Sequence, residues 1–374
     1  MQGSMPRNRA KRVVRGKKKR IGILTGGGDC PGLNAGIRAI AKTAILNYDM
    51  DVIGIKDGFL GLIENRFSHI SYEDVSGILT LGGTFIGASN KANPFRHPDF
   101  RGRFKDVSNM AVENYRAMEL DGLVCIGGDG SLNIAYKLYK KGIDLVGVPK
   151  TIDRDLKQTD ATIGFDSALI TATQAIDKLH TTAQSHHRVM IIEVMGRYAG
   201  WLALYSGLAG GGDIILLPEI PYNIKKVCEV VLERNQRGKR FSIVVVSEGA
   251  RPKAGKMVVK RIVKDSTDPV RLGGIGDKIA DDIEKITGLE TRVTVLGHLQ
   301  RGGEPSPFDR ILATRFGVAS CELVAKGDFG KVVTLKAGNI RAVDLAKAVR
   351  DIRRVSLKDP IIKTALSVGT SFGI

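Results

Sequence analysis

The chain has 374 residues, of which 43% are hydrophobic and 26% charged. This is the composition of a folded globular protein with room for two modest domains. Its apolar runs fall short of the roughly 20 residues that a bilayer-spanning helix needs, and its first 20 residues lack the apolar segment of a secretory signal. We therefore expect a cytoplasmic protein with no membrane partner.

The formal net charge is +18, from 57 Lys and Arg against 39 Asp and Glu. Residues 1–20 hold nine of these basic residues and no acidic one, so half of the excess lies in a basic arm with the composition of a disordered segment. The remaining positive charge suits an enzyme with phosphate-bearing substrates. Nucleic acid is not an expected partner, because the body shows no interleaved basic and aromatic pattern. The four cysteines lack CxxC spacing, which indicates reduced thiols.

Apolar runs alternate with stretches of helical apolar spacing along the body of the chain. Strands are expected at 20–25, 51–55, 122–130, 143–151, 188–196, 213–218, 241–249 and 292–303. Helices are expected at 30–45, 110–120, 131–142, 168–183 and 225–238. This alternation predicts an α/β fold of two doubly wound lobes, with largely parallel sheets and helices on both faces.

Glycines or unusual polar residues follow six of the expected strands. In open α/β sheets, ligands gather at the carboxyl ends of strands. Each loop alone could be an ordinary connection. Because such residues follow six different strands, we expect one active site in the cleft between the lobes.

Two glycine-rich loops carry the signal for a phosphate site. The loop at 26–29 matches neither common nucleotide fingerprint, and a structural turn explains it equally well. In the loop at 127–131, glycines clear space at a strand end and Asp129 stands at a helix start. Mg²⁺ favours one or two carboxylates together with phosphate oxygens. Asp129 is therefore the candidate metal ligand, and its alternative role is a helix N-cap.

The segment at 151–155 places Asp153 and Asp155 two residues apart after a strand. Phosphoryl transfer to a hydroxyl needs a base near the attacking oxygen, cations for the moving charge and clamps that fix the acceptor. Arginine binds phosphate bidentately and stays charged. The candidate phosphate-binding side chains are Arg188, Arg292, His298 and Arg301.

Six ordered motifs resemble those of the 6-phosphofructokinase family. They are GGGDCPGLNAGIR, GGTFIG, IGGDGS, PKTIDRD, MGR and LGHLQRGG, and the resemblance covers residues 20 to about 330. It implies a homo-oligomeric kinase of glycolysis that uses Mg²⁺. The implied reaction phosphorylates fructose 6-phosphate at its 1-hydroxyl with ATP and gives fructose 1,6-bisphosphate and ADP.

For the donor, the resemblance implies the nucleotide-binding residues Gly28, Lys91, Gly128, Asp129, Gly130 and Ser131, with Asp129 on the metal. In this family glycine at the position of Gly130 accompanies ATP, and aspartate accompanies pyrophosphate. An aspartate there would repel the α-phosphate of ATP. Lys150 resembles the branch that contains pyrophosphate-dependent and mixed enzymes. Glycine with lysine at these two positions is similar to the ATP-using members of that branch.

For the acceptor, the resemblance implies the substrate-binding residues Thr151, Ile152, Asp153, Arg188, Met195, Gly196, Arg197, Glu248, Arg292, His298 and Arg301. Asp153 would be the catalytic base, and Arg197 would stabilise the charge of the transferred group. Arg188 and Arg292 would reach the site of a neighbouring subunit. We therefore expect a homodimer or homotetramer with shared sites.

The same resemblance divides the body into two lobes. Residues 21–164 with 300–350 form the larger, nucleotide-binding lobe, and residues 165–299 with 351–374 form the smaller, sugar-phosphate-binding lobe. Residues 1–20 remain the basic arm.

Arg154 stands where the family usually has asparagine. A cation between two carboxylates would lower the pKa values of both. Arg154 therefore keeps open a low-activity protein that only binds sugar phosphate or nucleotide. The other alternative is a pyrophosphate-dependent phosphofructokinase.

Overall fold

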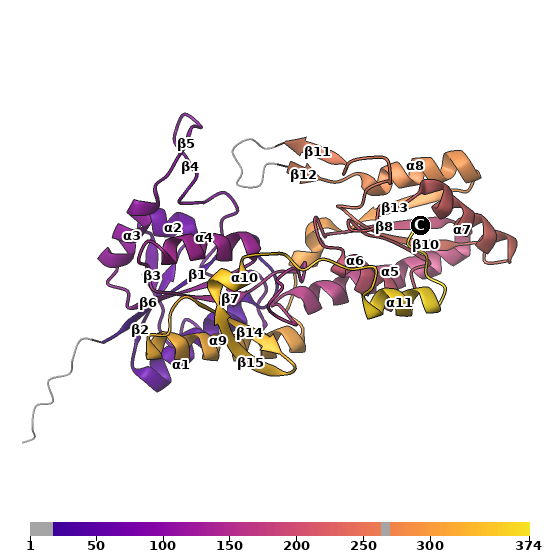
Figure 1. Ribbon diagram of the computed structural model, residues 1–374. Coiled ribbons are helices and arrows are strands. Elements are labelled where there is room, and N and C mark those ends of the chain that lie inside the picture. The colour runs from indigo at the N-terminus through magenta and orange to yellow at the C-terminus, as the bar shows by residue number, and fades with distance from the viewer. Residues whose placement is uncertain (1–17, 263–269) are drawn as a thin grey trace, which may run out of the picture.

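The structure is a computed structural model that describes residues 18–262 and 270–374. Its largest sheet has seven strands in the order β15-β14-β7-β6-β1-β2-β3 (Figure 1). Neighbours from β14 to β2 are parallel, and the outer strands β15 and β3 are antiparallel. The strands are β15 (Asn339–Asp344), β14 (Lys331–Lys336), β7 (Leu145–Pro149), β6 (Gly122–Gly127), β1 (Arg20–Thr25), β2 (Asp51–Ile55) and β3 (Phe67–His69).

Helices cover both faces of this sheet, because its central strands are apolar and buried along their length. Within β1, Ile21 and Ile23 join the core on one face, and Leu24 joins the core on the other. The first face is covered by α1 (Leu33–Tyr48) and α9 (Pro307–Lys326). The second is covered by α2 (Phe59–Glu64), α3 (Ser108–Ala117), α4 (Asp129–Tyr139) and α10 (Leu345–Ala348).

A second, four-stranded sheet is entirely parallel, in the order β13-β8-β10-β9. Its strands are β13 (Thr291–Val295), β8 (Val189–Val194), β10 (Ser242–Ser247) and β9 (Ile214–Leu216). One face packs against α5 (Phe165–His186), α6 (Trp201–Ala209) and α11 (Pro360–Ser367). The other packs against α7 (Ile224–Gln236) and α8 (Ile275–Thr287). The expected α/β fold of two lobes is confirmed.

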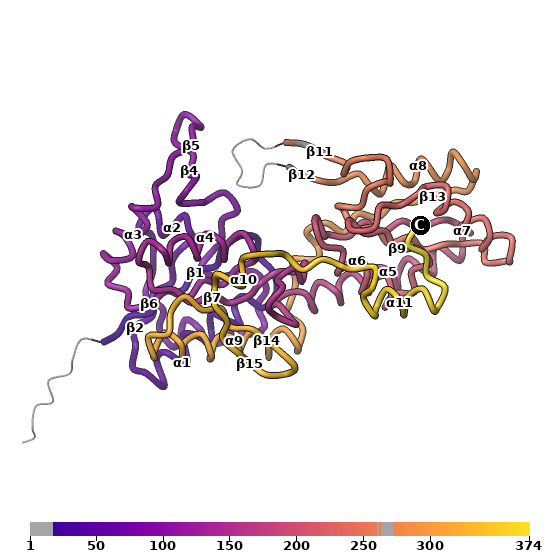
Figure 2. The backbone as a smooth tube through the Cα atoms, in the orientation of Figure 1, coloured from indigo at the N-terminus to yellow at the C-terminus, as the bar shows by residue number. Residues whose placement is uncertain are grey.

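The two lobes are not independent packing units, since one apolar cluster runs from α1 and α9 through α5 into the second lobe. The chain crosses between the lobes after β7, before α9 and between α10 and α11 (Figure 2). The strand expected at 292–303 ends at Val295, because residues 297–301 form a 3₁₀ helix, η2 (Gly297–Arg301). No helix in the described ranges is long and apolar enough to cross a bilayer.

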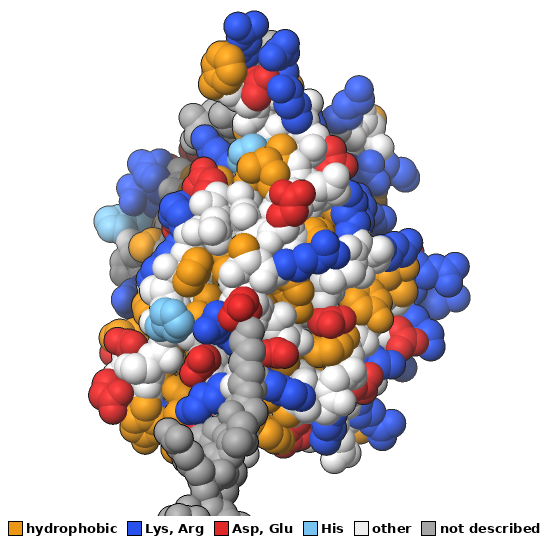
Figure 3. Space-filling view, turned by 90° about the vertical axis from the view of Figure 1, so that its left-hand side faces the viewer, with side chains coloured by type: hydrophobic (Ala, Val, Ile, Leu, Met, Phe, Trp, Pro, Cys, Tyr) orange, Lys and Arg blue, Asp and Glu red, His pale blue; other side chains and the backbone are white. Residues whose placement is uncertain are grey.

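Each lobe also carries an antiparallel hairpin that the sequence pattern did not indicate. One is β4 (His97–Pro98) with β5 (Phe104–Lys105), and the other is β11 (Val259–Ile262) with β12 (Val270–Leu272). The β4–β5 hairpin projects from the large lobe and carries basic and aromatic side chains (Figure 3). The Arg101 guanidinium lies 5.2 Å from the ring centre of Phe100, which is 90% exposed.

Candidate active site

Polar residues from both sheets meet at the carboxyl ends of parallel strands. In the large lobe, the loops after β1, β6 and β7 begin at residues 26, 128 and 150. In the small lobe, those after β8, β10 and β13 begin at 195, 248 and 296. Parallel strands place such loops along one edge of each sheet. The two edges meet where Arg301 lies against Gly28: a Cβ built on that glycine would come within 2.1 Å of the Arg301 Nη1 atom.

The first glycine loop is held from beneath by Lys150, whose side chain is only 4% exposed. Its Nζ donates a hydrogen bond to the Gly26 carbonyl at 3.0 Å and another to the Gly28 carbonyl. Burial lowers the pKa of Lys150. This lysine therefore fixes the loop from within the protein through its two hydrogen bonds to loop carbonyls.

The second glycine loop packs against the first through Ser131, at the start of α4. A Cβ on Gly127 would lie 2.4 Å from the Ser131 Cβ, and one on Gly26 would lie 2.7 Å from the Ser131 Oγ. These glycines are thus required by close packing. At Gly130 an added Cβ would meet nothing within 4 Å, so this position faces open space. The contrast makes Gly130 a place where a side chain would change the site without disturbing the fold.

Three aspartates lie on the large-lobe side of the cleft. Burial, and next to it the negative charge of Glu248, raise the pKa of Asp153. Burial and the charges of Asp153 and Asp129 raise the pKa of Asp155. Burial also raises the pKa of Asp129. Effects of this kind act between charges that lie near one another, so the three aspartates belong to one charged cluster, which Glu248 extends into the small lobe.

Cations offset part of this accumulated negative charge. Arg301, Arg197 and Lys150 each act to lower the pKa of Asp153. Within the described chain, the Arg301 Nε and the Asp155 Oδ1 are buried polar atoms without a hydrogen-bond partner. Buried polar groups are normally satisfied by protein, water or a ligand, so both atoms have hydrogen-bonding capacity to spare.

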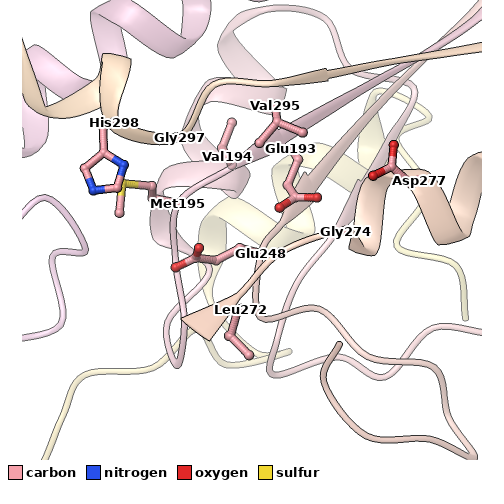
Figure 4. A pocket seen from close by; sticks show the side chains of 11 residues that line it. Glu193, Val194, Met195, Glu248, Leu272, Gly274, Asp277, Val295, Gly297 and His298 are labelled. Carbon is pink, nitrogen blue, oxygen red and sulfur yellow. The ribbon is translucent and has the colours of Figure 1, made fainter. Parts of the chain in front are cut away.

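The small lobe holds a pocket of about 400 Å³, and Glu248, whose charge raises the pKa of Asp153, is one of its lining residues (Figure 4). Its lining residues are Glu193, Val194, Met195, Glu248, Leu272, Gly273, Gly274, Asp277, Val295, Gly297 and His298. The loop after β8 is shaped by Gly196 at φ 136°, whose carbonyl accepts a hydrogen bond from the Ser247 hydroxyl at 2.5 Å. Burial raises the pKa of Glu248, and the nearby charge of Arg197 opposes that shift.

Two lining carboxylates, Glu193 and Asp277, are absent from the sequence-based set of site residues. Glu193 is 3% exposed, and its Oε2 accepts a hydrogen bond from the Gly276 amide at 2.9 Å. A carboxylate inside the otherwise apolar run VMIIEV was the available signal. Asp277 gave no local signal, because it lies on the polar side of an ordinary amphipathic helix.

Several expected site residues lie elsewhere or face away from the cleft. Arg188 and Arg292 stand where β8 and β13 begin, at the opposite end of the small sheet from the cleft, and both pair with Glu290. The side chain of Ile152 is 5% exposed and belongs to the apolar core. Lys91 is exposed and follows Ser89, which pairs with Gly26 in a short β-bridge.

Thr151 supports the start of the loop at 151–155, which we call the aspartate loop. Its hydroxyl accepts a hydrogen bond from the Asp153 amide at 3.1 Å, and its carbonyl accepts one from the Thr162 hydroxyl at 2.7 Å. Arg154 turns away from both neighbouring carboxylates and donates two hydrogen bonds to the Asp160 carbonyl. Arg154 therefore does not stand between the two carboxylates, where it would lower their pKa values.

The chain belongs to the phosphofructokinase family, since the family model described as Phosphofructokinase matches residues 20–324. It is similar to an ATP-dependent 6-phosphofructokinase 2 of Clostridium perfringens, with 52% identity over 95% of this chain and 98% of that protein. It is also similar to a pyrophosphate–fructose 6-phosphate 1-phosphotransferase of Streptomyces coelicolor, with 48% identity over 95% of this chain and all of that protein. The predicted family resemblance is confirmed.

Among solved structures, the chain resembles phosphofructokinase of Pichia pastoris in the T-state. The TM-score is 0.76 and the identity 31%, over 95% of this chain and 37% of that one. The present chain therefore spans little more than a third of the Pichia subunit, whereas it matches its bacterial relatives over nearly their whole length.

Proposed function

We propose that this chain transfers the γ-phosphoryl group of ATP to the 1-hydroxyl of fructose 6-phosphate, a step of glycolysis. One observation carries the proposal: Asp153, Asp155 and Asp129 form one charged cluster with Arg301, which lies against the glycine loop held by Lys150. A base, an acidic metal site and cations for the moving charge are the parts that phosphoryl transfer needs. The named activity of the Clostridium relative supports the same reaction.

Asp153 acts as the general base that accepts the proton of the attacking hydroxyl. Its raised pKa makes it a stronger base than an exposed aspartate, and the facing cations favour its ionised form. Arg197 and Arg301 stabilise negative charge that develops on the transferred group. The backbone amides of Gly28 and Gly128 face the donor phosphates, and the Arg301 guanidinium beside Gly28 adds positive charge there.

The residues present fit a magnesium ion. Asp129 would hold it, and the unpartnered Asp155 Oδ1 lies close enough to raise the local negative charge. Mg²⁺ is usually bound by one or two carboxylates together with phosphate oxygens. When bound, it neutralises charge on the donor phosphates.

ATP is the proposed donor because Gly130 leaves room for a nucleotide. Pyrophosphate is the second candidate, because the Streptomyces relative with that named donor is nearly as similar as the ATP-dependent one. The open space at Gly130 is the feature of this chain that favours ATP: an aspartate there would place its charge beside the α-phosphate.

The sugar occupies the pocket of the small lobe in this proposal. Met195, Gly196 and Glu248 contact the sugar, while His298 and Arg301 bind the 6-phosphate or its neighbourhood. Arg188 and Arg292 serve a neighbouring subunit, because they stand at the far end of the sheet from their own cleft. We accordingly infer a homodimer or homotetramer.

The remaining assignments belong to the same proposal. Residues 21–164 with 300–350 bind the nucleotide, and residues 165–299 with 351–374 bind the sugar phosphate. We infer a cytoplasmic location, since all four cysteines are buried free thiols. Of the basic arm at 1–20, residues 1–17 lie outside the described ranges.

A steady-state coupled assay with Mg²⁺, fructose 6-phosphate and ATP tests the proposal. Asp153→Asn should lower kcat about a thousandfold, within the range typical for loss of a general base, and leave KM for ATP nearly unchanged. Asp160→Asn is the matched control, because this carboxylate lies on the same loop but pairs with Lys336 on the surface. Equal activity of the two variants would contradict the role of Asp153.

A further inference from the structure

Arg154 is held by a cage of aromatic and carbonyl groups beneath the aspartate loop. Its guanidinium carbon lies 4.8 Å from the ring centre of Tyr205 and 5.2 Å from that of Phe165. Its Nε and Nη2 donate to the Asp160 carbonyl at 3.2 and 3.0 Å. Because guanidinium groups bind aromatic faces and carbonyls in defined directions, these contacts fix the side chain.

The cage continues into a second arginine and returns to the same loop. The Tyr205 and Trp201 rings lie 6.3 Å apart, and the Arg353 guanidinium carbon lies 4.6 Å from the Trp201 ring centre. The Trp201 Nε1 donates to the Arg353 carbonyl at 3.1 Å, and the Arg353 amide donates to the Asp155 carbonyl at 2.5 Å. A continuous series of contacts therefore connects the side chain of Arg154 to the backbone of Asp155, the next residue in the chain.

The segment that carries Arg353 crosses from the large lobe to the small one between α10 and α11 (Figure 2). We call residues 349–359 the strap. It pairs with the aspartate loop through the bridge of Leu156 with Ile352. Further on, the Val355 amide donates to the Glu219 carboxylate at 2.8 Å, and the same carboxylate accepts from the Gly200 amide, just before α6. The strap is therefore anchored on both sides of the cage.

The backbone at Arg154 needs such support. Its φ is 52°, in the left-handed region that residues with a Cβ adopt only rarely. Residues in that region persist where the surrounding contacts determine the conformation. A change of backbone conformation at this residue would reorient Asp153 and Asp155, which flank it directly.

We propose that Arg154 is a positioning residue: clamped between Phe165, Tyr205 and the Asp160 carbonyl, and joined through Trp201 to the strap, it fixes the orientation of the two flanking catalytic-loop aspartates. The expected loss of kcat rests on the proposed function, whereas the fixed orientation of the two aspartates does not. The clamp itself touches neither the donor loops nor the sugar pocket.

Two substitutions remove the clamp in different ways. Arg154→Asn deletes the guanidinium, and asparagine tolerates a positive φ, so the backbone stays accessible. Tyr205→Leu deletes the aromatic face but keeps an apolar side chain, while Tyr205→Phe keeps the ring as the conservative control. We expect kcat to fall about tenfold to a hundredfold for the first two, as a displaced catalytic group would cause. KM for both substrates should change less than about threefold, and the phenylalanine variant should recover most of the rate.

The double variant Arg154→Asn with Tyr205→Leu distinguishes one clamp from two separate effects. If both residues act through the same contact, the double variant should lose no more activity than the worse single variant. In the plot of kcat against pH, the apparent pKa of the acid limb should also shift in the two single variants and in the double variant, because the base would lie in a changed environment. A purely structural role would lower the thermal midpoint without moving this limb.

Trp201 offers a readout that needs no activity, since it is the chain's single tryptophan and is 2% exposed. Acrylamide quenching of its fluorescence should rise severalfold in Arg154→Asn and in Tyr205→Leu, but not in Tyr205→Phe. Unchanged quenching would overturn the proposed cage even if the wild type proved inactive as a kinase. If the wild type is active, the positioning role would be overturned by an Arg154→Asn variant whose kcat is unaltered. It would also be overturned if this variant showed only a raised KM.

Discussion

The two lobes build their sides of the candidate site in different ways. On the large-lobe side, glycine backbone packs against Ser131 and is held by the buried Lys150, so shape is fixed by the absence of side chains. On the small-lobe side, Glu248 and His298 line an open pocket of about 400 Å³. Substitutions on the large-lobe side should therefore fail by steric conflict or misplaced charge. Substitutions on the acceptor side should instead change affinity and titration.

Among the substitutions that compare the two sides, the largest effect is expected at Gly130, where an added Cβ would meet nothing within 4 Å. Gly130→Asp should lower kcat/KM for ATP about a hundredfold, because a carboxylate would repel the nucleotide phosphates. Gly130→Ala, which adds a methyl group without charge, should stay within about threefold of the wild type. Parallel assays with ATP and pyrophosphate measure both. If ATP use survives the aspartate, the donor argument is wrong.

Gly127 lies in the same loop and should behave in the opposite way to Gly130. An added Cβ would come within 2.4 Å of the Ser131 Cβ, so Gly127→Ala should lower the free energy of unfolding by about 2 kcal/mol, as overpacking commonly does. Urea denaturation followed by circular dichroism provides the measurement, with Gly130→Ala as the matched control. Equal stability of the two alanine variants would show that the donor loop is not fixed by packing.

Arg292 tests whether the acceptor side is completed by another subunit. Arg292→Ala should raise KM for fructose 6-phosphate about tenfold, the loss expected for one charge-assisted hydrogen bond to phosphate, with kcat little changed. Mixing this variant with Asp153→Asn and refolding them together should yield hybrid oligomers that contain some intact sites. Activity of the mixture above that of either parent variant would support shared sites. If the mixture recovered no activity, Arg292 would lie outside the site.

The smallest effect is expected in the pH dependence. Glu248 raises the pKa of Asp153, so Glu248→Gln should lower that pKa. The base would then stay ionised to lower pH, and the acid limb of the kcat profile should move to lower pH by less than about one unit. Profiles between pH 5 and 8 at saturating substrate measure the shift. Movement toward higher pH would contradict the electrostatic account of this pair.

Most of the strands and the chemistry at their ends could be predicted from the sequence. The runs that became β1, β6, β7 and β8 are apolar except for Arg20, Thr25 and Glu193, and short parallel strands buried on both faces have this pattern. The resemblance of the segment at 149–155 to a family motif singled out Asp153. These features are local, so a single sequence carries them.

The cage around Arg154 could not be predicted, because its members are distant in the chain. Tyr205 and Arg353 are 51 and 199 residues from Arg154, and neither has a distinctive local pattern. The same holds for η2, where Gly297 at φ 48° turns the chain out of an otherwise strand-like run. Long-range packing overrides local pattern in both places.

The most direct test of the reaction is ³¹P NMR of purified protein incubated with Mg²⁺, ATP and fructose 6-phosphate. We expect a new phosphomonoester resonance from the 1-position of the sugar, formed in step with ADP and absent with Asp153→Asn. Release of inorganic phosphate with no doubly phosphorylated sugar, or equal product from the wild type and this variant, would contradict it.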